Sequence, residues 1–257
     1  MPNGSIPLDR LVRYCEERLQ PQQFTDYDRA VNGLQVENRG SVHRIAACVD
    51  ATLATVEMAA DAGADLMVVH HGLFWAKTTP WTGRRYQLIR RLMDSDIAVY
   101  SQHLPLDGHP KLGNAAQLAT ALRLGRSVPF FAHKGTTLGV QAKLSKPIAL
   151  DDLASRMTAA LGGKPTVLRG GGATCRRIGI CTGGAGAELE QAAAEGVDTF
   201  ITGEGPHWTA ALAEEAGINV LYGGHYATET FGVKALAAEL SKKFGVPWTF
   251  LDRPSGL

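Results

Sequence analysis

The sequence predicts an α/β protein made of two similar α/β lobes that arose by an internal duplication. Short apolar segments of strand character alternate with amphipathic helical segments, which is typical of βαβ units and a mostly parallel sheet. The segment 44–72 can also be laid over 177–205 with a constant shift of 133 residues and no gap. A repeat of this length covers at least one supersecondary unit, so we expect lobes at residues 1–126 and 127–257.

The repeat is carried by identities spread over the whole segment. They are Arg44, Ile45, Cys48, Glu57, Ala59, Ala60, Gly63, Asp65 and Gly72, which recur as Arg177, Ile178, Cys181, Glu190, Ala192, Ala193, Gly196, Asp198 and Gly205. A second correspondence follows in another register. The motifs His103-x-x-x-Asp107 and His225-x-x-x-Glu229 each come directly after the next predicted strand of their half. Two correspondences together favour duplication over shared composition.

The first half begins with a predicted helix over residues 5–19, with Ser5 as its N-cap. A short strand is expected in VNGLQVEN. The segments RIAACVD, DLMVVH and IAVYS are predicted strands, and they alternate with predicted helices over residues 52–62, 83–94 and 114–122.

The second half repeats this plan. The segments RIGIC, VDTFIT and INVLYGG are predicted strands, and helices are predicted over residues 187–195, 206–216 and 228–244. Residues 127–174 contain a strand candidate, TLGVQAKL, and a helix candidate that begins near Asp151. We interpret this stretch as a crossing region with some structure of its own.

Composition excludes several classes of protein. The chain has 257 residues, 45% hydrophobic and 20% charged, with a formal net charge of +1. These values are ordinary for a globular protein, and they give no basic excess for binding a phosphate backbone. No apolar run approaches the roughly 20 residues that span a bilayer, and the N-terminus lacks a signal peptide. Four scattered cysteines without a CxxC motif indicate reduced thiols, so we expect a cytoplasmic protein.

Histidine and carboxylate residues gather where predicted strands end. His70 ends DLMVVH and His71 follows it, His103 and Asp107 follow IAVYS, and His225 and Glu229 follow INVLYGG. Ligands bind at the carboxyl ends of the strands in open parallel sheets. We therefore expect these three sequence-distant clusters to carry the chemistry of the protein.

Imidazole nitrogen and carboxylate oxygen together suit Zn²⁺, Mn²⁺ or Fe²⁺, and no cysteine lies nearby to form a zinc–thiolate site. Adjacent histidines at a strand end can splay, each binding a different ion, and Glu229 could bridge both. Such a pair of ions would acidify a shared water and stabilise developing oxyanions. The sequence thus predicts two divalent metal ions bound by His70, His71, Asp107, His225 and Glu229.

Each motif alone has a simpler reading. A His-His pair is often buried and satisfied, the H-x-x-x-E spacing arises by chance on helices, and Asp107 before Gly108 suits a turn. Two further residues stay open. His103 is a candidate ligand or proton donor, and Glu204 is a candidate general acid/base, a partner of the metal ligands, or a simple helix N-terminal carboxylate.

Other features give weaker signals. The glycine-rich TGGAGAELE resembles a phosphate cradle but lacks the lysine of a P-loop, so we favour a tight turn. Phe74, Trp75 and Trp81 could wall a planar substrate such as a nucleobase, or belong to a core or subunit interface. His109 looks like a loop residue.

Several longer strings resemble one known family. They are VNGLQVE, GADLMVVHHGLFW, HLPLDGHPKLGNAAQLA, FITGE and GGHYATETFGVKALA. They are similar, over nearly the whole chain and in family order, to the GTP cyclohydrolase I type 2 homologues, also called the NIF-three-like proteins. This chain resembles the short form, which lacks the domain that some members carry between the halves.

The resemblance implies a NIF-three-like fold that assembles as a toroidal homohexamer with a dinuclear metal centre. It places the metal ligands at His70, His71, Asp107, His225 and Glu229. The family name implies hydrolytic opening of the guanine ring of GTP, a cyclic amidine, with release of formate, although kinship of fold does not fix a substrate.

Three functions compete at this point. The first is a metal-dependent hydrolase that acts on a nucleotide-like small molecule, with His103 or Glu204 moving protons. The second is a non-catalytic metal-binding scaffold that regulates protein partners. The third is a ring that handles nucleic acid through Arg84, Arg85, Arg90, Arg91, Arg123 and Arg126, against which the near-neutral charge argues.

Overall fold

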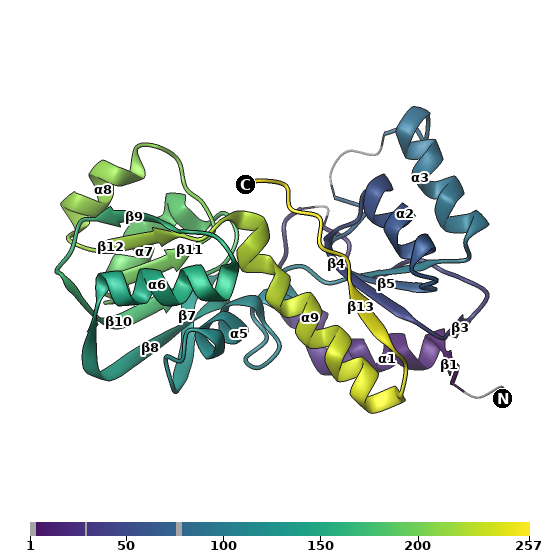
Figure 1. The fold of residues 1–257 in the computed structure, drawn as a ribbon, viewed down its shortest axis with the longest axis horizontal. Helices are drawn as coiled ribbons and strands as arrows, with labels where there is room; N and C mark the ends of the chain where they lie inside the picture. The colour runs from purple at the N-terminus through teal and green to yellow at the C-terminus, as the bar shows by residue number, and fades with distance from the viewer. Residues whose placement is uncertain (1–3, 29, 76–78) are drawn as a thin grey trace. The chain divides into compact units, whose positions relative to one another are not determined.

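The fold is that of a computed structural model, which describes residues 4–28, 30–75 and 79–257. Strands and helices alternate as predicted, and they form two compact units (Figure 1). The first unit comprises Met1–Leu106 and Gly232–Arg253, and the second comprises Asp107–Phe231 and Pro254–Leu257. The predicted α/β fold class is therefore confirmed. These bounds differ from those of the expected lobes 1–126 and 127–257, because the second unit already begins at Asp107 and Gly232–Arg253 belongs to the first unit.

The first unit holds a five-stranded sheet in the order β13-β4-β5-β6-β2. Its strands are β2 (Gly33–Val36), β4 (Ile45–Asp50), β5 (Leu66–His71), β6 (Ala98–Ser101) and β13 (Trp248–Phe250). The strands β13, β4, β5 and β6 run parallel to one another, and the edge strand β2 runs antiparallel to β6. A separate antiparallel pair joins β1 (Ile6–Pro7) to β3 (Ser41–Val42).

Helices cover both faces of this sheet. The helices α2 (Leu53–Asp61) and α3 (Gly83–Asp94) lie on one face, and α1 (Leu8–Leu19) lies on the other with the C-terminal part of α9 (His225–Phe244) (Figure 1). The hydroxyl of Tyr14 and Nε of Arg18 each donate to the Glu239 carboxylate, at 2.8 and 2.7 Å, and so join α1 to α9. A short 3-10 helix, Pro21–Gln23, follows α1, and α4 (Leu104–Asp107) follows β6.

The second unit holds a six-stranded sheet in the order β7-β8-β10-β11-β12-β9. Its strands are β7 (Ser127–His133), β8 (Thr136–Ala149), β9 (Thr166–Arg169), β10 (Thr174–Ile180), β11 (Thr199–Thr202) and β12 (Asn219–Tyr222). Only the central β10, β11 and β12 run parallel among the described pairs, because β7, β8 and β9 pair antiparallel with their neighbours.

The helices of the second unit also divide between two faces. An apolar core packs α5 (Asn114–Ala121) and α6 (Leu150–Leu161) against one face of the sheet, through side chains such as Leu118, Leu153 and Ile178. The helices α7 (Leu189–Ala194) and α8 (Thr209–Ala216) pack against each other on the other side (Figure 1). A 3-10 helix, Ala185–Glu188, precedes α7.

Three expectations need correction. Ser5 does not cap the first helix, because α1 begins at Leu8 with Pro7 at its N-cap and Ile6–Pro7 forms a strand. Residues 127–174 do not form a crossing region, because they supply β7, β8 and β9, which extend the second sheet. The last helix begins at His225 and not at residue 228, so both His225 and Glu229 lie on α9.

Local hydrogen bonds support the predicted duplication. The Asp65 carboxylate accepts from the backbone N–H groups of His43 and Arg44, and the Asp198 carboxylate accepts from those of Arg176 and Arg177. In each pair of strands the register also matches at the predicted shift, since Ile45 pairs with Leu66 and Ile178 with Thr199. The same pattern of hydrogen bonds between a carboxylate and the backbone therefore occurs at corresponding positions of β4 and β10.

Candidate metal centre

Three histidines come together at the carboxyl edge of the first sheet. His70 and His71 are the last residues of β5, and His103 follows the neighbouring β6. The ring centroid of His70 lies 4.7 Å from that of His71 and 4.9 Å from that of His103. One ring nitrogen of each lies within 4.8 Å of the others, a spacing that could hold a metal ion. The side chains of His70 and His103 are buried, so two of the three histidines are shielded from solvent.

Each of these rings is held through Nδ1 by an oxygen acceptor. Nδ1 of His71 lies 2.8 Å from the carboxylate of Asp50, Nδ1 of His103 lies 2.8 Å from that of Asp26, and Nδ1 of His70 lies 3.0 Å from the backbone carbonyl of Gln102. A carbonyl or carboxylate oxygen can only accept, so Nδ1 carries the proton in each ring. In the neutral imidazole Nε2 then carries the lone pair, which is the arrangement of metal-binding histidines.

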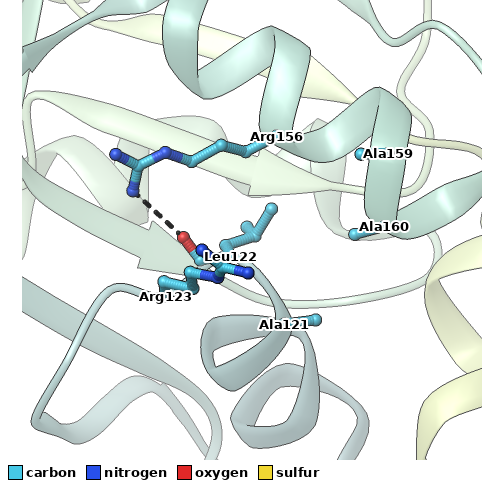
Figure 2. A pocket seen from close by; sticks show the side chains of 6 residues that line it. All are labelled: Ala121, Leu122, Arg123, Arg156, Ala159 and Ala160. Carbon is cyan, nitrogen blue, oxygen red and sulfur yellow. Dashed lines mark hydrogen bonds between the residues drawn. The ribbon is translucent and has the colours of Figure 1, made fainter.

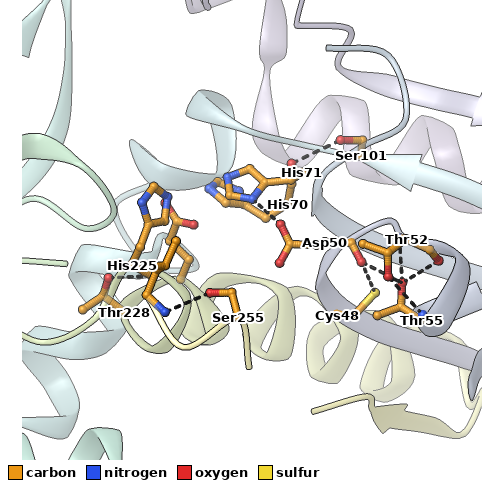
Figure 3. A network of polar contacts seen from close by, with 12 residues as sticks. Cys48, Asp50, Thr52, Thr55, His70, His71, Ser101, His225, Thr228 and Ser255 are labelled. Carbon is orange, nitrogen blue, oxygen red and sulfur yellow. Dashed lines mark hydrogen bonds and ion pairs between the residues drawn. The ribbon is translucent and has the colours of Figure 1, made fainter. Parts of the chain in front are cut away.

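Asp50 is fixed by the end of β4 and the start of α2. Its backbone carbonyl accepts from the Thr55 hydroxyl at 2.8 Å and from the Cys48 thiol at 3.5 Å (Figure 3). Thr52 and Thr55 form a reciprocal capping box at the first turn of α2. The loop that carries the Asp50 side chain is therefore rigid where it meets His71.

Asp26 holds the loop before β2 against His103. Its carboxylate accepts from Nδ1 of His103, from the backbone N–H of Tyr27 at 2.7 Å and from the side-chain amide of Asn32 at 2.8 Å. Burial raises the pKa of this carboxyl, but the hydrogen bonds from His103, Asn32 and Tyr27 outweigh it and lower the pKa to about 2. Asp26 is therefore an anion at neutral pH, although only 7% of its side chain is exposed.

The second unit contributes a histidine and a glutamate one helical turn apart. His225 begins α9, and its Nε2 lies 3.2 Å from Oε1 of Glu229, whose side chain is buried. Ligand atoms about 2 Å from one tetrahedral or octahedral cation lie roughly 3 Å from each other. The observed spacing therefore fits two ligands of a single ion.

His225 is also held through Nδ1, in this case by a carboxylate oxygen of Glu204 at 2.8 Å. The hydrogen bond to Glu229, together with the charges of both glutamates, outweighs burial and raises the pKa of His225 to about 9. A ring placed between two carboxylates attracts positive charge, and a divalent cation on Nε2 would replace the proton. Glu204 is thus a partner of His225, one of the readings that the sequence left open.

Asp107 is the last residue of α4, and the loop after β10 lies beside it. Its Oδ1 accepts from the buried amide of Asn114 at 2.8 Å and from the Thr182 hydroxyl at 3.4 Å. The next residue of this loop, Gly183, has a φ of 71°, and a Cβ there would collide with Oε1 of Glu229. The glycine-rich loop is therefore a tight turn that accommodates the carboxylates, as favoured from the sequence.

The structure thus places the predicted site residues in two clusters. His70, His71 and His103 form the cluster of the first unit, and Asp107, Glu204, His225 and Glu229 lie at strand and helix ends of the second. Nitrogen and oxygen donors of this kind, with Nδ1 of four histidines held by oxygen, fit Zn²⁺, Mn²⁺ or Fe²⁺. All four cysteines are free and buried, and burial raises the pKa of Cys48 to about 12. Thiolate ligation is thus not favoured.

Sequence reasoning missed Asp26 and Asp50. Asp50 ends the predicted strand next to DLMVVH, so the same argument from strand ends that selected the histidines could have identified it. Asp26 lies in an irregular loop with no periodic signal. His109 lies in the loop between α4 and α5, as expected, but it is buried, and its Nδ1 accepts from the backbone N–H groups of Lys111 and Leu112.

A cavity elsewhere in the second unit does not belong to this site. It has a volume of about 430 Å³ and lies between the end of α5 and α6 (Figure 2). Its lining residues are Ala121, Leu122, Arg123, Arg156, Ala159 and Ala160. Arg156 donates to the backbone carbonyl of Leu122 at 3.2 Å, so this guanidinium caps the C-terminus of α5.

Across the described residues, no helix has the length and apolar character needed to cross a membrane.

Comparison with known proteins identifies the family. A family model described as Duf34/NIF3 (NGG1p interacting factor 3) matches residues 6–255. A protein of Deinococcus radiodurans named GTP cyclohydrolase 1 type 2 homolog is 41% identical over 254 residues, which cover 99% of this chain and 96% of that one. A protein of the same name from Halobacterium salinarum is 46% identical over 240 residues, 91% of this chain and 94% of that one.

A solved structure agrees. The crystal structure of a protein from Thermus thermophilus is similar with a TM-score of 0.90 and 38% identity, over 98% of this chain and 100% of that one. The chain therefore belongs to the Duf34/NIF3 family.

Proposed function

We propose that this protein binds two divalent metal ions and acts as a metal-dependent hydrolase on a nucleotide-like small molecule. The proposed ligands are His70, His71, Asp107, His225 and Glu229. The observation that carries the proposal is the Nδ1 contact of the three histidine ligands with oxygen acceptors, at 2.8 to 3.0 Å. This pattern orients Nε2 toward a cation and raises its basicity.

The residues of the chain have separate tasks in this proposal. Asp50, Glu204 and the Gln102 carbonyl fix the histidine rings, and Asp107 is held by Asn114. Bound divalent ions would supply Lewis acidity, which activates water and stabilises negative charge on oxygen. His103 is the proposed proton carrier, because the Asp26 carboxylate accepts from its Nδ1 and so fixes the orientation of the ring.

Two arguments support a nucleotide-like substrate. The relatives from Deinococcus radiodurans and Halobacterium salinarum carry the name GTP cyclohydrolase 1 type 2 homolog. Ring opening of a purine is the hydrolysis of a cyclic amidine, a reaction that requires an activated water and a proton donor to nitrogen. Both requirements match the residue types of the site.

Metal analysis and turnover assays test the proposal together. The protein, loaded in turn with Zn²⁺, Mn²⁺ or Fe²⁺, is assayed against GTP and a panel of nucleotides beside His71→Ala and His207→Ala. His207 is an exposed histidine outside the clusters and serves as the matched control. We expect about two ions per chain and a turnover that His71→Ala abolishes and His207→Ala retains. Equal residual turnover in wild type and His71→Ala would refute the hydrolase.

The same experiment separates the competing functions. A metal-binding regulatory scaffold predicts two tightly bound ions with no turnover on any nucleotide. The nucleic-acid reading has little support from α3, because Arg90 pairs with Asp94, Arg91 pairs with Asp61 and the Arg85 guanidinium stacks over Trp81. We favour the hydrolase because buried, oriented histidines are typical of a reactive site.

We also propose that the protein is a cytoplasmic homohexamer, as the family resemblance implies. Light scattering tests the assembly, since a hexamer has six times the mass of the 27.4 kDa chain. A monomer at micromolar concentration would contradict it.

A further inference from the structure

Two aromatic side chains surround His103 within the first unit. The ring of Trp75 lies 4.6 Å from that of His103, centroid to centroid, at an interplanar angle of 81°. The ring of Tyr27 lies 5.7 Å from it at an angle of 38°. Trp75 also lies 5.4 Å from His71. Because the two angles to His103 differ so much, the rings of Tyr27 and Trp75 are not parallel to each other.

This aromatic pair, Tyr27 and Trp75, is exposed where the histidines are not. The exposed fraction is 60% for Tyr27 and 37% for Trp75, against 8% for His103. Exposed apolar side chains that lie together on a surface can mark a ligand-binding site. Phe74 is different, because it packs edge-on against Trp81 with ring centroids 6.0 Å apart.

The backbone of Tyr27 is held by the same carboxylate that orients His103. Oδ1 of Asp26 accepts from both the backbone N–H of Tyr27 and Nδ1 of His103. The Asn32 side chain completes the arrangement, since it donates to Asp26 and accepts from the backbone N–H of His103 at 2.7 Å. Tyr27 and His103 are therefore positioned together.

We infer that Tyr27 and Trp75 bind the planar heteroaromatic ring of the substrate, a purine or a ring of similar size, and place it beside His103. This inference rests on the proposed function and names the part of the site that recognises the ring. Exposed aromatic faces bind any flat π-system, and each stacked base contributes about 1–3 kcal/mol in proteins that bind single-stranded nucleic acid. A ring stacked on Tyr27 or Trp75 would lie beside His103, since both aromatic rings neighbour that histidine.

Calorimetric titration with guanosine 5′-monophosphate tests this role, with ribose 5-phosphate as the matched ligand without a ring. The variants are Tyr27→Ala, Tyr27→Phe, Trp75→Leu and Trp75→Phe. Tyr86→Ala removes a 50% exposed tyrosine on α3 and is the matched control. We expect Tyr27→Ala and Trp75→Leu to weaken nucleotide binding about tenfold. The Phe variants and Tyr86→Ala should bind as the wild type does, and ribose 5-phosphate should bind weakly to all.

Two other measurements keep this test distinct from that of the proposed function. Metal content and thermal unfolding of each variant should equal those of the wild type, since neither ring is a proposed ligand. Nucleotide binding unchanged in Tyr27→Ala and Trp75→Leu, or equal binding of ribose 5-phosphate, would overturn the inference even if the metals and turnover are found. Failure to find metal or turnover, with ring-dependent binding intact, would overturn the proposed function alone. No nucleotide binding by the wild type would overturn the aromatic role.

Discussion

The carboxylate of Asp50 lies 2.8 Å from Nδ1 of His71, at the ends of two adjacent parallel strands. This contact fixes the orientation and the tautomer of the His71 ring, and it does not involve Nε2. We therefore predict that Asp50→Asn weakens metal binding by about 10- to 100-fold while the fold is retained. Competition with a metal chelator measures the change.

The matched control is Asp61→Asn, since Asp61 is an exposed aspartate of the same unit that pairs with Arg91 at 3.4 Å. Metal affinity should not change in this variant. An Asp50→Asn protein with wild-type affinity would show that the contact does not support a ligand.

Stability should depend on pH through Asp26. Its pKa of about 2 in the folded chain lies below the ordinary value of 3.8, so its stabilisation is present above about pH 4 and is lost as the pH falls toward 2. A shift of this size corresponds to about 2 kcal/mol at neutral pH. Urea unfolding of metal-free wild type and Asp26→Asn, at pH 7 and pH 3, measures it.

The difference in unfolding free energy between these two proteins should shrink by about 1 kcal/mol from pH 7 to pH 3. The comparison between the proteins removes the contribution of other carboxylates. A difference that is the same at both pH values would contradict the role assigned to Asp26.

Substitution of Gly183 should destabilise the protein more than substitution of a glycine of similar conformation. Gly183 and Gly162 have φ angles of 71° and 77°, but a Cβ would collide with Glu229 only at Gly183, since nothing lies within 4 Å at Gly162. We expect Gly162→Ala to cost about 1 kcal/mol and Gly183→Ala about 3 kcal/mol. Denaturant unfolding and metal content are the measurements.

Loss of metal should accompany Gly183→Ala and not Gly162→Ala, because only the former displaces a proposed ligand. Equal costs and equal metal contents would show that Glu229 does not depend on this close approach.

The cysteines should be unreactive in the native protein. Burial raises the pKa of Cys48 to about 12, and burial with the nearby Asp107, Glu188 and Glu229 charges raises that of Cys181 well above its ordinary value. Few thiolates therefore exist at pH 8, and a disulfide reagent should modify the four thiols only as the chain unfolds. Rapid modification of any thiol in folded, metal-free protein would be inconsistent with this burial.

Much of the fold was predictable because local pattern and tertiary structure agree. The strand predicted at residues 65–70 lies within one residue of Leu66–His71, and the helix Gly83–Asp94 was predicted with its observed bounds, since buried parallel strands are continuous apolar segments. The edge strands were harder. Trp248–Phe250 joins the first sheet beside β4 from far along the chain, and no local signal reveals such a partner.

The site was predictable to the extent that it lies at strand ends. His70, His71 and His103 meet as expected because β5 and β6 are adjacent and parallel. Asp26 and Tyr27 were missed because they lie in a loop far from His103 in the sequence. Asp26 and His103, which are in contact, are 77 residues apart. Single-sequence patterns carry no information about contacts of this kind.

The central claim is that five side chains hold two cations. A diffraction experiment at the absorption edges of zinc, iron and manganese, on crystals of the protein as purified, tests it most directly. We predict two anomalous peaks bound by His70, His71, Asp107, His225 and Glu229, with Nε2 as the histidine ligand atom. Absence of any peak after soaking in these metals, with His70 and His71 remote from His225 and Glu229, would contradict the claim.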